Sequence, residues 1–129
     1  MSKEIGSLLA GLTILVVEED YYQATDAQEA FERAGATIAG PFSTASAAIR
    51  AVEQRPPDCA VIDINLGAGP HFDLARELKK RGIPTVFVSG YRAAIIPEDL
   101  RGTAYVEKPA ELPVLISAVH AAALAAGRA

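Results

Sequence analysis

The chain has little of several features that mark special classes of protein. It has one cysteine, Cys59, in 129 residues, which excludes an internal disulfide and fits a reducing, cytoplasmic compartment. No apolar stretch approaches the roughly 20 residues that span a bilayer. Lysine and arginine number 12 against 16 acids, a net charge of −4. This balance gives no basic excess that would attract nucleic acid or an anionic membrane.

No low-complexity linker or internal repeat divides the chain. Its 129 residues are enough for one domain with a core and too few for two. Residues 1–11 contain one lysine and a short apolar patch, too weak for a signal peptide, and are expected to form a leader. Residues 12–126 are expected to form the domain, with no output domain after the last helix.

Apolar runs of strand type alternate with stretches of helical periodicity. Strands are expected at Thr13–Val17, Ala36–Ala39, Cys59–Ile64, Pro84–Val88 and Thr103–Val106. Helices are expected at Asp20–Ala34, from an N-cap at Ser43 to about Gln54, from about Pro70 to Lys80, and from about Glu111 to Ala126. Glycine and proline between Val88 and Thr103 leave room only for irregular turns near Ala93–Leu100. The pattern predicts a doubly wound (βα)₅ α/β fold with an irregular or short fourth helix.

Three of these strands end in charged groups. Glu18, Glu19 and Asp20 follow the first strand, Asp63 ends the third, and Lys108 follows the fifth. Because parallel strands place their carboxyl ends at one edge of a sheet, where ligands bind, these side chains should converge. Acids and a lysine at one edge are the components of a metal-assisted phosphoryl-transfer site.

This ordered set resembles the receiver domain of bacterial two-component response regulators, over about Thr13 to Ala126. The matching features are the acidic cluster, Asp63, Ser89 and Lys108-Pro109, each at the end of its own strand. The resemblance implies a flavodoxin-like parallel sheet of order 2-1-3-4-5, a histidine kinase or phosphotransfer partner, and a divalent cation, usually Mg²⁺. Val86–Tyr91 further resembles a single-domain subgroup with a Phe-Ala-Thr-Gly-like motif.

The resemblance assigns roles to the residues around the predicted metal. Asp63 would be the phosphoacceptor nucleophile, and Lys108 would contact a phosphoryl oxygen. Glu18, Glu19, Asp63 and the backbone carbonyl of Asn65 would hold Mg²⁺, and the Asn65 side chain would modulate autodephosphorylation. The family usually has Asp where this chain has Glu19. Since Mg²⁺ tolerates little distortion, this departure predicts weaker metal binding, and Glu19 could instead pair with Lys108.

The resemblance also assigns a switch. Ser89 would hydrogen-bond the phosphoryl group and move toward it, and the rotamer of Tyr105 would follow. Gly90 would leave access open, whereas Tyr91 would either shield the phosphate or cover the sheet edge. Pro109 matches a family proline whose preceding peptide bond is typically cis.

The sequence therefore favours a single-domain response regulator that accepts a phosphoryl group on Asp63. It would catalyse only its own phosphorylation and dephosphorylation, and signal by binding a downstream protein as a monomer or weak homodimer. Two alternatives remain open. One is a degenerate receiver that binds partners without phosphorylation. The other, a small Mg²⁺-dependent aspartyl-phosphate phosphatase, is disfavoured because no residues remain for a substrate pocket.

Overall fold

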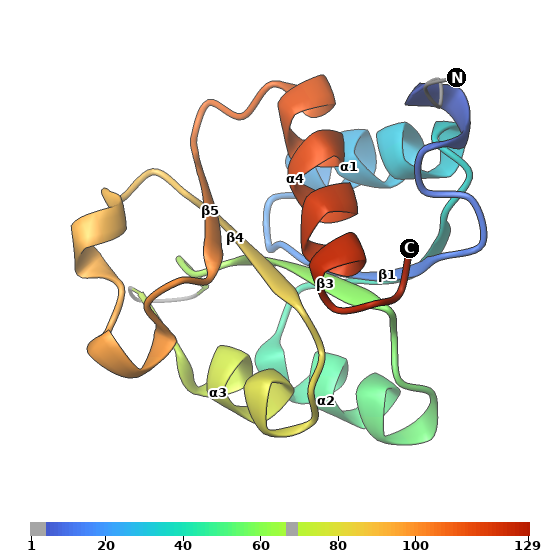
Figure 1. The fold of residues 1–129 in the computed structure, drawn as a ribbon. Coiled ribbons are helices and arrows are strands. Elements are labelled where there is room, and N and C mark those ends of the chain that lie inside the picture. The colour runs from blue at the N-terminus through green and yellow to red at the C-terminus, as the bar shows by residue number, and fades with distance from the viewer. Residues whose placement is uncertain (1–4, 67–69) are drawn as a thin grey trace.

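A five-stranded parallel sheet lies between two layers of helices in the computed structural model, which describes residues 5–66 and 70–129 (Figure 1). The strand order is β2-β1-β3-β4-β5, as the flavodoxin-like prediction required. The strands are β1 (Thr13–Val17), β2 (Thr37–Phe42), β3 (Cys59–Asp63), β4 (Thr85–Ser89) and β5 (Ala104–Glu107). Every residue of the central strand β3 is buried.

The helices cover the two faces of the sheet in pairs (Figure 1). They are α1 (Tyr21–Arg33) and α4 (Leu112–Ala125) on one face, and α2 (Ala45–Gln54) and α3 (Asp73–Lys80) on the other. Because side chains alternate along a strand, β1 supplies Ile14 and Val16 to the first core and Leu15 and Val17 to the second. The two cores fix the sheet, and with it the positions of the strand ends.

The expected leader contributes to the first core where the structure describes it. Residues 1–4 lie outside the described residues, and Ile5–Ser7 form a 3₁₀ turn. Leu9 is fully buried, and its backbone N–H donates to the carbonyl of Ala34 at 2.8 Å. This segment therefore packs against the end of α1.

The prediction that the second strand ends before Gly40-Pro41 was wrong, because β2 continues through both residues to Phe42. Proline lacks an N–H, but β2 is an edge strand and its register against β1 shifts at this point. Gly40 has φ +102°, and a Cβ there would lie 2.7 Å from the backbone nitrogen of Phe42. The chain therefore needs glycine at this position. The Gly40-Pro41 peptide bond is cis.

Two predicted helix starts were also wrong. Thr44, not Ser43, is the N-cap of α2, and its side chain accepts from the backbone N–H of Ala47 at 3.2 Å. Both residue types cap helices well, so the sequence alone could not separate two neighbours. Helix α3 begins at Asp73 rather than near Pro70. The preceding loop includes residues 67–69, which lie outside the described residues.

The irregular fourth segment is confirmed. Two 3₁₀ turns, η2 (Ala93–Ile95) and η3 (Glu98–Leu100), stand where a regular helix would complete the pattern. Leu100 is buried in the second core. The guanidinium of Arg76 on α3 pairs with Asp99 at 2.8 Å and ties the segment to the helix layer. Among the helices of the described residues, none is long and apolar enough to cross a membrane.

Candidate functional site

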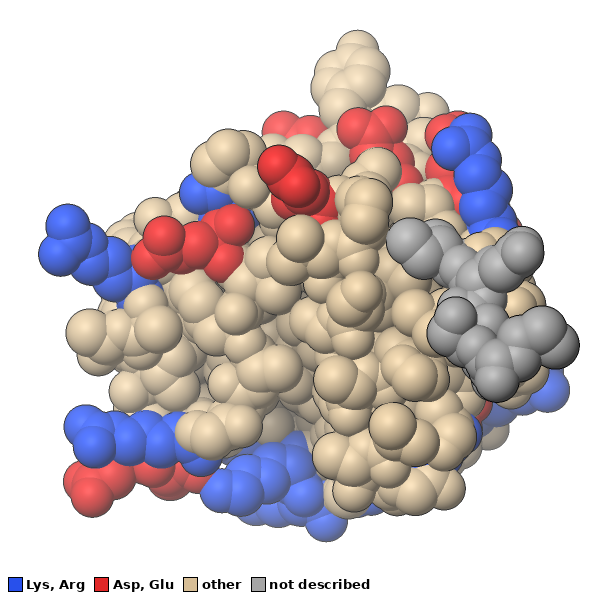
Figure 2. All heavy atoms as spheres, turned by 45° about the horizontal axis from the view of Figure 1, so that its top comes forward, with Lys and Arg blue, Asp and Glu red and all other residues tan. Residues whose placement is uncertain are grey.

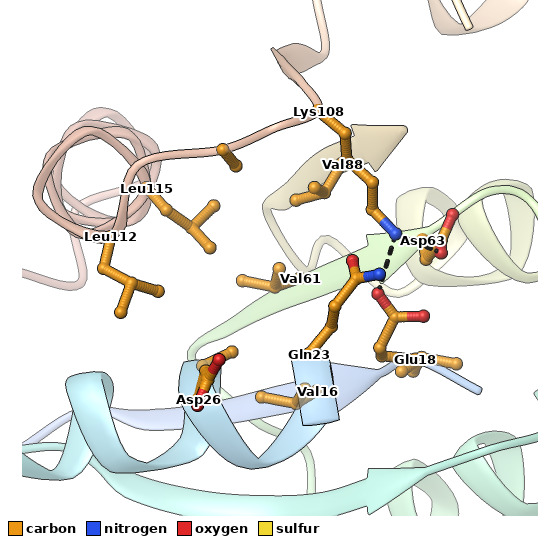
Figure 3. A pocket seen from close by; sticks show the side chains of 13 residues that line it. Val16, Glu18, Gln23, Asp26, Val61, Asp63, Val88, Lys108, Leu112 and Leu115 are labelled. Carbon is orange, nitrogen blue, oxygen red and sulfur yellow. Dashed lines mark hydrogen bonds and ion pairs between the residues drawn. The ribbon is translucent and has the colours of Figure 1, made fainter. Parts of the chain in front are cut away.

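The ends of three strands meet at the carboxyl edge of the sheet (Figure 3). The ammonium nitrogen of Lys108 lies 2.8 Å from Oδ2 of Asp63 and 3.0 Å from Oε1 of Glu18. These residues are separated by 45 and 90 positions along the chain. The structure thus brings the predicted nucleophile, one predicted metal ligand and the predicted phosphoryl-binding lysine into one cluster.

Backbone pairing fixes this geometry. In the parallel ladder Asp63 pairs with Val88, and the backbone N–H of Lys108 donates to the carbonyl of Ser89 at 2.8 Å. The backbone N–H of Asn65 donates to Oδ1 of Asp63, also at 2.8 Å. Each oxygen of the Asp63 carboxylate thus has a donor. The Lys108-Pro109 peptide bond is cis, as the resemblance implied.

The cluster contains two carboxylates and one ammonium in a partly buried setting. Burial and the neighbouring Asp63 raise the pKa of Glu18, although its bond to Lys108 acts in the opposite direction. Burial by itself would lower the pKa of Lys108, but bonds to Asp63 and Glu18 together raise it. The two carboxylates and the one ammonium leave the cluster with a net negative charge. A further cation would therefore be attracted to it.

The predicted switch residues meet at the main chain of Tyr91. Ser89 is fully buried, and its hydroxyl oxygen accepts from the backbone N–H of Tyr91 at 3.0 Å. The phenol of Tyr105 donates to the carbonyl oxygen of Tyr91, and burial raises the pKa of this phenol. The side chain of Tyr91 is exposed, as is Gly90. Ser89 and Tyr105 are thus connected through one peptide segment.

The three consecutive acids after β1 have different positions. Glu18 is half-buried and reaches Lys108, whereas Glu19 is exposed. Asp20, where the sequence predicted that the helix begins, is the N-cap of α1 and accepts from the backbone N–H of Gln23 at 3.0 Å. On this loop, Lys108 therefore pairs with Glu18. The sequence had also allowed a pair between Lys108 and Glu19.

The donor set of the cluster agrees in kind with Mg²⁺. Among the described residues, no group of three or more His, Cys, Asp or Glu side chains is arranged to hold a metal ion. Mg²⁺, however, is commonly bound by only one or two carboxylates and keeps several water molecules. Glu18 and Asp63 supply two carboxylates. Glu19 was also predicted as a metal ligand, but it is exposed on the loop and is not one of the two acids that pair with Lys108.

A pocket of about 120 Å³ lies beside the cluster (Figure 3). Its apolar walls come from the sheet, from Ala27 of α1, and from Leu112 and Leu115 of α4. Sequence reasoning missed Gln23 and Asp26, which also line it. The available signal was their spacing, because Gln23 and Asp26 are three residues apart and therefore lie on one face of α1.

Comparison with known proteins agrees with this architecture. The family model described as "Response regulator receiver domain" matches residues 14–120, and no curated protein matches the chain. A response regulator receiver protein from Sinorhizobium medicae WSM419 is 25% identical, with TM-score 0.76, over 93% of this chain and 99% of that one.

Two further solved structures share the fold. The REC domain of the PhyR response regulator from Erythrobacter litoralis has TM-score 0.78 and 20% identity, covering 89% of this chain and 92% of that chain. PhyR from Brucella abortus has TM-score 0.77 and 22% identity over 92% of this chain. This chain spans only 51% of the Brucella protein. With the family match over residues 14–120 and the order of its five strands, the chain belongs to the response regulator receiver domain family.

Proposed function

We propose that this chain is the phosphoryl-accepting component of a two-component or phosphorelay system. Asp63 accepts the phosphoryl group from a phosphohistidine of a histidine kinase or phosphotransfer protein. The signal then passes by binding to another protein, and no separate substrate is turned over. The observation that carries the proposal is the contact of Lys108 with both Glu18 and Asp63 at 3.0 and 2.8 Å.

The chemistry follows from the donors on Asp63. A carboxylate oxygen attacks phosphorus, a new O–P bond forms, and the N–P bond of the phosphohistidine breaks with the imidazole as leaving group. Lys108 then exchanges its bond to Asp63 for one to a phosphoryl oxygen. Glu18 and Asp63 would hold Mg²⁺, which neutralises charge on the transferred group. The backbone N–H of Asn65, 2.8 Å from Oδ1, keeps the carboxylate oriented.

The switch would work through Ser89 and Tyr105. A phosphoryl group on Asp63 adds about −1.5 to −2 charges at pH 7. The Ser89 hydroxyl already accepts from the Tyr91 N–H, so its own proton is available to a phosphoryl oxygen. A movement of Ser89 would displace the Tyr91 backbone and the Tyr105 phenol bonded to it. Whether the chain belongs to the single-domain subgroup stays a prediction from Val86–Tyr91.

A specific observation favours a second candidate, a receiver that binds partners without being phosphorylated. Glu19 is exposed, and Lys108 already pairs with both Glu18 and Asp63. The cluster can therefore be stable without a metal. In this case Asp63 would serve stability only.

Phosphorylation with acetyl phosphate and Mg²⁺, followed by intact-mass measurement, distinguishes the two candidates. The wild type should gain one phosphoryl group, and Asp63→Asn should gain none. Asp73→Asn, a matched change of a fully exposed carboxylate, should behave as the wild type does. An unmodified wild type would support the phosphorylation-independent receiver. An adduct on Asp63→Asn would place the acceptor elsewhere.

A further inference from the structure

A second and larger cleft lies at the opposite end of the sheet, where β4 and β5 begin. Its volume of about 490 Å³ is within the range of about 300–1,000 Å³ typical of small-molecule sites. Ala75 of α3 and Ala122 and Ala125 of α4 contribute to its walls. In Figure 1, β4 starts beside the end of α3 and rises past the carboxyl-terminal half of α4. The small side chains of Ala122 and Ala125 leave the cleft open on the side of α4.

The charged side chains that line this cleft are cations. Its described lining contains two cations, Lys79 and Arg101, and neither an aspartate nor a glutamate, although the chain as a whole has a net charge of −4. The ammonium of Lys79 donates to the main-chain carbonyl of Asp99. The guanidinium of Arg128 lies 3.4 Å from the carbonyl oxygen of Gly82 on the rim, but it is paired with Asp58 at 3.6 Å and so does not add an unpaired cation.

The remaining lining is suited to an apolar body with a polar end. Pro84, Ala104 and the alanines of α4 provide apolar surface, whereas Ile83 and Leu100 are only 4% and 2% exposed. The hydroxyl of Thr103 can donate a hydrogen bond. A guanidinium presents paired N–H groups that match a carboxylate or phosphate. A cationic ligand would be repelled, and a purely apolar ligand would leave the cations without a counter-charge.

We propose that this cleft binds a small amphiphilic anion. A flat apolar body lies against Pro84 and the alanines of α4, and a carboxylate, sulfonate or phosphate end pairs with Arg101 and Lys79. The site does not depend on phosphorylation of Asp63, because it lies at the other end of the strands. It contacts the first residues of β4 and β5, the strands that lead to Ser89 and Lys108.

Titration of the ¹⁵N-labelled chain with 1-naphthoate tests the proposal, because this anion cannot donate a phosphoryl group. Amide shifts should move at Gly82, Gly102 and Thr103. The neutral analogue 1-naphthamide should bind about tenfold more weakly, as expected for loss of a charge-assisted pair. Arg101→Glu should weaken naphthoate binding by a similar factor and leave naphthamide binding unchanged. Arg50→Glu, an equivalent change on the exposed side of α2, should alter neither.

Several results would overturn the proposal. These are the absence of amide shifts up to the solubility limit of the anion, equal affinities for the anion and the amide, shifts centred on Asp63, or unchanged binding by Arg101→Glu. The amide spectrum of each variant reports whether it is folded. If Arg101→Glu fails to fold, Arg101→Gln removes the charge alone and should still weaken the anion more than the amide. Equal weakening of both probes would also contradict an anion site.

Discussion

The charged side chains at the two ends of the sheet differ in how deeply they are buried. At the carboxyl end, Glu18, Asp63 and Lys108 are drawn together, with side-chain exposures of 10%, 6% and 22%, beside a pocket of only about 120 Å³. At the amino end, Lys79 and Arg101 are exposed around an open cleft of about 490 Å³. Charge is thus largely buried in one paired cluster at the first end, and exposed to solvent in the cleft at the second.

The comparison shows how position in a parallel sheet determines the cost of a charge. At the carboxyl end a strand delivers its next side chain directly into the layer between helices, so each charge needs a partner. At the amino end the cations of the cleft lie on α3 and on the turn after η3, where water can reach them. Large effects of mutation are therefore expected at the first end and small ones at the second.

The largest expected effect follows from Lys108→Met. It leaves two partly buried carboxylates close together without their shared cation, a change that typically costs about 3 kcal/mol of stability. Urea unfolding at neutral pH with a chelator present measures it. Lys80→Met, which removes an exposed lysine from α3, is the control and should have little effect. Equal stability of the two variants would contradict the contrast between the ends.

A smaller effect is expected from filling the pocket at the carboxyl end. Ala27 is nearly buried, with 8% of its surface exposed, and it lines the pocket. Ala27→Leu should therefore place apolar atoms into empty space and stabilise the fold by about 1 kcal/mol. Ala125→Leu is the matched change in the open cleft, where the added atoms stay in water. Thermal unfolding measures both variants. If Ala125→Leu is stabilised and Ala27→Leu is not, the conclusion that the pocket is enclosed and the cleft is open to water is wrong.

The pH dependence of stability tests the electrostatic effect of placing Glu18 close to Asp63. Glu18 has a pKa raised above its ordinary value of 4.5, so the folded chain holds its proton more tightly than the unfolded chain does. The resulting contribution is fully present below pH 4.5 and is lost as pH rises through the raised value. Metal-free wild type should therefore lose stability relative to Glu18→Gln over that window. Parallel curves for the two proteins would count against the raised pKa.

Much of this architecture was predictable, because the relevant signals are local. The apolar runs that become strands, and the charged residues directly after them, are visible as strings. The parallel arrangement then forces Asp63 and Lys108 to the same edge. The choice between Glu18 and Glu19 as the partner of Lys108 was not predictable. It depends on which of three consecutive side chains points inward after β1, and residue type does not decide that.

The pocket at the carboxyl end and the cleft at the amino end could not be predicted from the sequence either. Ala27 and Ala125 are both alanines in helices that pack on the sheet, so the sequence does not distinguish them. Whether an alanine leaves an enclosed pocket or an exposed cleft depends on the neighbouring helix and on loops distant in the chain. The continuation of β2 past Gly40-Pro41 has a similar origin, because only an edge position makes that proline acceptable.

The smallest expected effect concerns the ion pair that joins α3 to η3. Arg76 lies 2.8 Å from Asp99, but their side chains are 40% and 54% exposed, so Asp99→Asn should hardly change global stability. Its bond to Arg76 lowers the pKa of Asp99 below 3.8. Any contribution is therefore present above pH 3.8 and is lost as pH falls through the lowered value.

The local consequence of Asp99→Asn should be measurable even so. Amide hydrogens of Leu100 and Thr103 close the turns of this segment, bonded to the carbonyls of Pro97 and Leu100 at 3.0 and 3.2 Å. They should exchange faster in Asp99→Asn, because the segment loses one of its ties to α3. The amide of Lys108, held by β4 at 2.8 Å, should not. Faster exchange at Lys108 as well would mean that the two ends of the sheet open together, and the contrast between them would apply to charge alone and not to stability.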